Sequence, residues 1–140
     1  MEMKPWLPPV LIIGALAGLT IWSSRHKTEP VGVQFIRCAD PVAGCAFVHR
    51  GQASQLRFSS LPEPLKPFDI ELNAPAAAKV SVRFQMGGME MGFNRYDFKP
   101  GGGVFKANAI LLPVCTQARS DWSAFFALDD TSYQVSFQTR

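Results

Sequence analysis

Three of the chain's five methionines gather in one short segment, at Met86, Met89 and Met91. Thioether sulfur is a soft ligand, so a convergent methionine cluster suits Cu(I) better than it suits hard cations. Methionine also fills gaps in ordinary apolar cores. Residues two apart share a face of a β-strand, so Met89 and Met91 can point the same way if this segment is extended. Residue type and spacing therefore leave two interpretations open: a Cu(I) site, or core methionines beside the glycines at 87 and 88.

The cysteines add to the inventory of soft ligands. Cys38 and Cys45 are separated by Ala-Asp-Pro-Val-Ala-Gly, a turn-rich segment that can bring two strand ends together. Such a pair oxidises readily outside the cytoplasm and rarely does so within it. Closeness in sequence favours a bridge between these two, which leaves Cys115 as either a further ligand or a small buried hydrophobe. A thiol-redox protein using Cys38 and Cys45 is a third possible class.

Other chemistries have little support in the sequence. The chain holds two histidines, and its serines lack the Gly-x-Ser-x-Gly context of a nucleophile. Gly101–Gly103 lacks the Lys-Ser/Thr that follows a phosphate-binding loop. The net charge of +3 is scattered, which argues against nucleic-acid binding. We therefore expect a protein that is not an enzyme. His49 is predicted to be a surface histidine at a strand end.

The segment from Trp6 to Trp22 contains no charged residue and lies near the lower limit of about 17 residues for a membrane-spanning helix. Tryptophans at both ends suit the two membrane interfaces. Ala15-Leu-Ala17 resembles a signal-peptide cleavage site, but apolar residues continue beyond it, which favours an uncleaved anchor. Basic residues flank the segment on both sides, so the cysteine pair decides the orientation. We predict an anchor and linker over 1–30 and a periplasmic domain over 31–140.

The domain has the pattern of an all-β fold. Period-two apolar alternation, bounded by Gly, Pro, Asn, Asp or Ser, predicts strands around 33–35, 45–49, 56–58, 68–72, 80–86, 122–128 and 133–137. The three prolines of 61–67 exclude a central strand, and that segment is predicted to cross between sheets. Turns are predicted at Gly87-Gly88, where a bulge is the alternative, at Gly101–Gly103 and at 129–132. Asn94 and Arg95 are predicted to form a turn with an ion pair to Glu90 or Asp97. Seven or eight short strands without a soluble helix predict an antiparallel β-sandwich of immunoglobulin type.

Two motifs carry a resemblance to a known group of proteins. The run Met89-Glu-Met-Gly-Phe-Asn-Arg95 follows a Pro-rich connection and a Val-x-Val-x-Phe strand, and Leu112-Pro-Val-Cys115 precedes a Trp-containing strand. From about Cys38 onward the chain resembles the YtkA-like and FixH-like membrane-anchored periplasmic proteins of bacteria. The resemblance implies copper handling and assembly of respiratory haem–copper oxidases, beside oxidase subunits or a Sco-type copper chaperone. It points first to Met89 and Met91, then to Met86 and Cys115.

Together these observations predict a single-pass protein of the bacterial inner membrane whose periplasmic domain binds Cu(I) and acts in copper delivery or oxidase assembly. The alternative is a metal-free interaction module, in which the same sandwich docks on a membrane complex and the methionines belong to its core.

Overall fold

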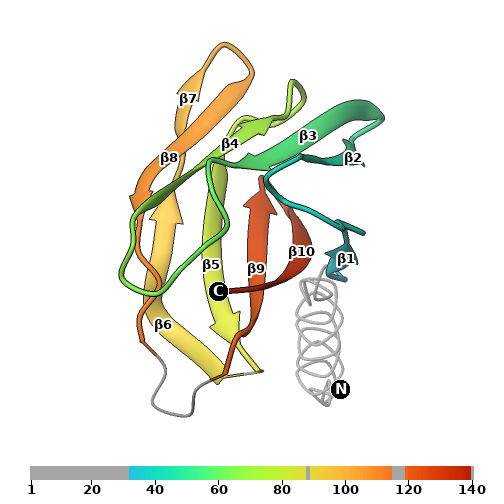
Figure 1. Ribbon diagram of the computed structural model, residues 1–140. Coiled ribbons are helices and arrows are strands. Elements are labelled where there is room, and N and C mark those ends of the chain that lie inside the picture. Colours follow the sequence, from blue (N-terminus) through green and yellow to red (C-terminus); the bar gives the residue numbers. More distant parts are fainter. Residues whose placement is uncertain (1–31, 88, 115–118, 140) are drawn as a thin grey trace, which may run out of the picture. The chain divides into compact units, whose positions relative to one another are not determined.

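A computed structural model describes residues 32–87, 89–114 and 119–139, with the side chains of 90–93 excepted. Ten strands lie within these residues: β1 (Gln34–Phe35), β2 (Cys45–His49), β3 (Gln52–Phe58), β4 (Phe68–Asn73), β5 (Val80–Met86), β6 (Met89–Asp97), β7 (Lys99–Gly101), β8 (Val104–Ile110), β9 (Asp121–Leu128) and β10 (Thr131–Gln138). They form two five-stranded sheets in the orders β1-β10-β9-β5-β6 and β2-β3-β4-β8-β7, seen in Figure 1. Every pairing is antiparallel except that of β1 with β10. The predicted all-β sandwich is confirmed.

The predicted anchor, its linker and their boundary with the domain at residues 30 and 31 lie outside the described residues. Within the described part, no helix is long and apolar enough to cross a membrane.

The period-two runs become the inner faces of the two sheets. Along β4 buried and exposed residues alternate strictly, and β9 alternates between buried residues and more exposed ones. Alternate side chains point to opposite faces of a strand, so each run supplies one apolar face to a shared core. The core also joins the sheets through aromatic rings: Phe58 of β3 packs edge-on against Phe137 of β10, with ring centroids 5.5 Å apart.

Three strands between Met89 and Ile110 have weaker sequence patterns. In β8 the alternation breaks because the register with β4 shifts between Phe68 and Ile70. Ala109 adopts a left-handed backbone at this irregularity, with φ of 54°. The Ala109 N–H donates to the Asp69 carboxylate at 2.8 Å. This side-chain hydrogen bond replaces the ladder hydrogen bond that the shift in register removes from the N–H. A bulge of this kind interrupts the period on which strand prediction depends.

The proline-rich segment 61–67 does not cross between sheets, as the sequence suggested. It connects β3 to β4, which are antiparallel neighbours in the same sheet. The prolines do exclude a strand here, but they cannot indicate which sheet the chain enters next. The loop is held to the domain instead by a hydrogen bond from the Leu65 N–H to the Leu112 carbonyl.

Tight turns connect the hairpins where glycine and aspartate predicted them. Gly102 and Gly103 have φ of 66° and 87° between β7 and β8. Asp129 and Asp130 join β9 to β10, whose first paired residues are Leu128 and Thr131. The predicted turn at Asn94 and Arg95 is wrong, because both residues lie inside β6. The predicted ion pair from Arg95 to Asp97 is present at 3.9 Å, between side chains 62% and 74% exposed.

Candidate functional site

The methionine segment forms the β5–β6 hairpin. Met86 ends β5 and Met89 begins β6, and these two residues are direct partners across the ladder. Gly87, between them, has φ of 52°, a conformation that favours glycine. Gly87 therefore lies in a tight turn between β5 and β6, and a turn was one of the two features predicted for this segment. Direct cross-strand partners have Cβ atoms about 4.5–5.5 Å apart, so this turn brings two thioether side chains to the end of one hairpin.

The two methionines differ in exposure. Met86 is fully buried. Its strand, β5, lies between β6 and β9, and its register partner on β9 is Trp122. Met89 is 48% exposed. The pair therefore spans the boundary between the apolar core and solvent. Met91 follows two residues later on β6, but its side chain and the whole of Cys115 lie outside the described residues.

The chain returns to this hairpin shortly after Cys115. The Arg119 guanidinium lies against Gly87, in the space that a β-carbon there would occupy. Two hydrogen bonds to Asp121, at 2.9 and 2.7 Å, hold that guanidinium in place. Donation from Arg119 lowers the pKa of Asp121 below its usual value. A side chain at Gly87 would thus displace Arg119 as well as strain the turn.

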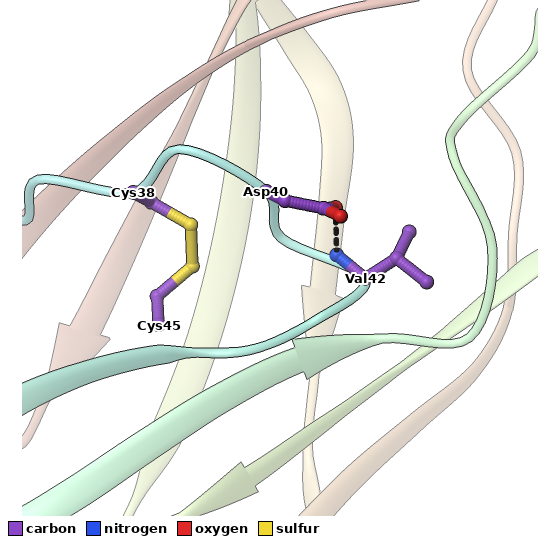
Figure 2. Close-up of a disulfide and its surroundings, with 4 residues drawn as sticks. All are labelled: Cys38, Asp40, Val42 and Cys45. Carbon is purple, nitrogen blue, oxygen red and sulfur yellow. Dashed lines mark hydrogen bonds between the residues drawn. A yellow bond between two sulfur atoms is a disulfide. The ribbon is translucent and has the colours of Figure 1, made fainter.

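Cys38 and Cys45 form a disulfide, as predicted, with Cα atoms 5.3 Å apart. Figure 2 shows the loop that it closes, in which the Val42 N–H donates to the Asp40 carboxylate. The Gly44 N–H donates to the Asp40 carbonyl at 3.2 Å, and the Pro41 carbonyl accepts from the Phe58 N–H at 2.8 Å. The bridge therefore secures a loop that is also hydrogen-bonded internally and to the end of β3.

A cavity of about 930 Å³ adjoins the disulfide loop. The loop, the proline-rich segment and the end of β10 line it, and its polar groups include Asp40, Glu63 and Lys66. Lys66 is ion-paired with Glu63. The cavity is large enough for a small ligand or an extended peptide segment, but its mixed charge and polarity indicate no particular occupant.

His49 is fully buried, so its predicted surface location is wrong. It does end a strand, but Cys45, Phe47 and His49 form the inward series of β2, and the last member shares that orientation. Its Nδ1 hydrogen-bonds the Tyr133 hydroxyl at 2.9 Å. Its Nε2 has no hydrogen-bond partner among the described residues and lies 3.8 Å from Asp129 Oδ2. The alternation that predicted the strand was itself the signal that this histidine faces inward.

Asp129 organises the end of the sandwich where His49 lies. Its Oδ1 accepts from the N–H groups of Ala78 and Lys79 at 3.1 and 2.9 Å, and its Oδ2 lies 3.4 Å from Arg50. Burial alone would raise the pKa of this carboxyl, but the two N–H groups, Arg50 and His49 together hold it below the usual 3.8. One carboxylate thereby links the β2–β3 turn, the start of β5 and the β9–β10 turn.

Asp129 has φ of 54°, and asparagine also tolerates this left-handed backbone. We therefore expect Asp129→Asn to lower the free energy of unfolding by about 1–2 kcal/mol at pH 7, because the charge-assisted hydrogen bonds to the carboxylate are lost. Since the folded-state pKa is depressed, the contribution is present above the unfolded-state pKa. It disappears as pH falls through the folded-state value. Urea denaturation at pH 7 and pH 3 measures the difference between the two proteins, which should shrink at the lower pH.

Asp130→Asn is the matched control for this change. Asp130 occupies the same turn and pairs with Arg50, but it is 76% exposed. Its replacement should alter stability little at either pH. An Asp129→Asn protein as stable as the original at pH 7 would contradict the linking role of Asp129.

Nowhere in 32–87, 89–114 and 119–139 do three or more His, Cys, Asp or Glu side chains form a group that could hold a metal ion. The disulfide also removes two thiols from the ligand set. Of the four predicted ligands, the structure describes the side chains of Met86 and Met89.

Comparison with protein-family models, with characterised proteins and with solved structures finds no match for this chain.

Proposed function

We propose that this chain is a membrane-anchored periplasmic protein that handles Cu(I), with Met89 and Met91 as its first ligands. One observation carries the proposal: Met86 and Met89 lie directly opposite each other at the end of the β5–β6 hairpin. Met89 is accessible for exchange with solvent or a partner, whereas Met86 can approach an ion only from the core side. Soft thioethers at the edge of an apolar environment suit Cu(I) rather than Mg²⁺ or Ca²⁺.

Several features support the wider setting of this proposal. An uncharged segment flanked by tryptophans precedes the domain, and the disulfide suits an oxidising compartment. The resemblance to FixH-like and YtkA-like proteins suggests a place in haem–copper oxidase assembly, with oxidase subunits or a Sco-type chaperone as partners. Cys115 is the fourth proposed ligand. The proposed role is delivery or assembly, without catalysis.

The strand order supports an immunoglobulin-type assignment for the sandwich. Strands β3-β4-β8-β7 follow the chain order of strands A, B, E and D, and β10-β9-β5-β6 follow that of G, F, C and C′. In this arrangement the methionine hairpin connects C to C′, and the short β1 and β2 are additions at the sheet edges.

Anaerobic Cu(I) titration against a competing chelator tests the copper proposal. The double variant Met89→Leu, Met91→Leu keeps nearly the same side-chain volume, so its stability should fall by less than about 1.5 kcal/mol. Its Cu(I) affinity should fall roughly ten-fold or more, because leucine has no lone pair to donate. Trp122 is the only tryptophan after residue 31. In a protein with Trp6 and Trp22 replaced by phenylalanine, its fluorescence reports on the region beside Met86.

Met3→Leu is the matched control, since it makes the same chemical change outside the hairpin. It should leave Cu(I) affinity unchanged. Equal Cu(I) affinity in the original protein and in a well-folded Met89→Leu, Met91→Leu variant would overturn the proposal.

A second candidate function, a metal-free interaction module, is favoured by the position of β6. This nine-residue strand forms one edge of its sheet and pairs only with β5 among the described strands of that sheet. An exposed edge offers backbone N–H and C=O groups to an added strand. If the module binds a membrane complex through this edge, substitution of an edge residue by proline should abolish binding, while the double leucine variant should still bind.

A further inference from the structure

Strand β10 has an open backbone edge along its second half. On one side β10 pairs with β9 along its whole length, but on its other side β1 pairs only with Tyr133 and Gln134. Figure 1 shows β1 and β10 at one edge of their sheet and β6 at the other. After β1 the chain leaves this sheet, because its next strand, β2, belongs to the other one. Among the described residues, no strand therefore lies beside the second half of β10 on this side.

The backbone groups of Ser136 and Gln138 point toward the open edge. Residues of an antiparallel strand direct their N–H and C=O groups alternately to one side and to the other. Gln134 faces β1, because its carbonyl accepts from the N–H of the residue after that strand at 2.9 Å. Thr139 faces β9, because its N–H donates to the Ser120 carbonyl at 2.9 Å. Ser136 and Gln138 share the direction of Gln134, and within the described part of the chain neither has a backbone hydrogen bond on that side.

This edge opens into the cavity of about 930 Å³ beside the disulfide loop. Ser136, Phe137 and Gln138 line that cavity together with the disulfide loop and the proline-rich segment. The side chains of the lining indicate no particular occupant, but the backbone of β10 does. Free N–H and C=O groups on a sheet edge pair with an extended strand through main-chain hydrogen bonds.

The other walls of the cavity are held in place without a ligand. The disulfide closes one of them, and the Pro41 carbonyl of that loop accepts from the Phe58 N–H at 2.8 Å. In the proline-rich segment the Leu65 N–H donates to the Leu112 carbonyl at 3.0 Å. A site with ordered walls loses less conformational entropy when it binds a ligand.

The parts of this chain that adjoin the cavity already have other positions. Because β1 is parallel to β10, a backward continuation of β1 would face Ser132 and Thr131 and would lead away from Ser136. The residues after β1 form the disulfide loop, and Thr139 is hydrogen-bonded on the β9 side. The occupant that fits the open edge is thus a segment of another polypeptide.

We propose that the second half of β10 binds an extended peptide segment of a partner protein, which joins the sheet as an added strand. Every second side chain of such a strand faces the interior of the sandwich. There Val42, Leu61 and Phe137 supply the apolar part of the cavity lining. The partner segment therefore alternates apolar and polar residues. This site is at the opposite edge of the sheet from β6 and is independent of the copper proposal.

The probe for this site is an acetylated heptapeptide in which valine and threonine alternate between two terminal lysines. It is titrated into the ¹⁵N-labelled full-length chain in neutral detergent and followed by NMR, and saturable shifts of the Ser136 and Gln138 amides are expected. Ser136→Pro should weaken binding roughly ten-fold or more, because proline has no N–H and its ring blocks the edge. Proline is tolerated on edge strands, and the dispersion of the spectrum verifies that the variant is folded.

Ser136→Ala is the matched control, because it removes the hydroxyl, which lies 3.4 Å from that of Ser123, but keeps the backbone N–H. It should leave the affinity for the peptide unchanged. Two modified peptides test the same pairing from the other side, one N-methylated at its valines and one at its threonines. Only one of these sets of N–H groups can face β10, so one peptide should bind like the original and the other roughly ten-fold more weakly.

Three results would overturn the site: no saturable shift with the original peptide, equal binding by the Ser136→Pro protein, or equal binding of the two N-methylated peptides. Shifts confined to the amides of β6 would place the added strand at the other edge of the sheet and would also overturn it. Shifts of the Ser136 and Gln138 amides that depend on protein concentration without peptide would identify a second copy of this chain as the occupant, against the proposed partner segment.

Discussion

Replacing Phe84 by alanine is expected to lower the free energy of unfolding by about 3–5 kcal/mol, the largest single-residue effect that we anticipate. Phe84 is 1% exposed, and its ring contacts the rings of Phe68, Tyr96 and Phe137 with centroids 6.2 to 6.4 Å apart. Because Phe68 belongs to the opposite sheet, the substitution would open a cavity between the two layers. Chemical denaturation in urea, followed by circular dichroism, measures the loss.

Phe125→Ala provides the matched control for that change. Phe125 is on β9, directly opposite Arg83 of the neighbouring strand β5, but it faces outward and is only partly buried. Its replacement removes one partly exposed cation–π contact and should cost about 1 kcal/mol. Comparable losses for the two substitutions would show that the inter-layer core does not dominate stability.

Removal of the disulfide should produce the second largest loss of stability. The bridge joins residues seven apart in sequence, and closing so short a loop restricts the unfolded chain by an amount equivalent to about 2–3 kcal/mol. We expect Cys38→Ala, Cys45→Ala to lower the free energy of unfolding by that amount. Alanine avoids placing a hydroxyl at the buried Cys45 position. Urea denaturation of the oxidised protein and the variant gives the comparison.

Reduction supplies an internal control for the disulfide. The original protein in the presence of a reductant should match the double variant, and the variant should not respond to the reductant. In a Cys115→Ala protein, the difference in the free energy of unfolding between the oxidised and the reduced forms should be unchanged. A non-reducing peptide map that joins Cys115 to either partner would contradict the pairing and would also remove Cys115 from the proposed ligands.

Local regularity explains which strands could be predicted. In β4, β5, β9 and β10 the inward-facing residues recur at every second position, because each strand buries one face against the same core. In β8 the irregular register beside Ala109 disturbs the alternation, and β6 carries glycine and small polar residues among its apolar ones. Periodicity reports burial on one face, so it is strongest where pairing is regular and weakest beside a bulge.

Among the candidate site residues, the sequence determined those that depend on local geometry. The adjacent glycines predicted a turn or a bulge after Met86, and the chain does reverse between Met86 and Met89. The short turn-rich loop likewise made Cys38 and Cys45 the favoured pair. In both cases the partners are close along the chain, so few conformations bring them together.

The tertiary structure decided everything that depends on residues distant in sequence. Met86 is buried and Met89 exposed because β5 is flanked by β9 on one side while β6 remains at the sheet edge. His49 is enclosed because Tyr133 and Asp129 arrive from a hairpin some 80 residues later. The opposition of Arg83 to Arg95 follows from the register of two strands. Alternation fixes which face a side chain occupies, but only the packing of strands fixes which side chains meet there.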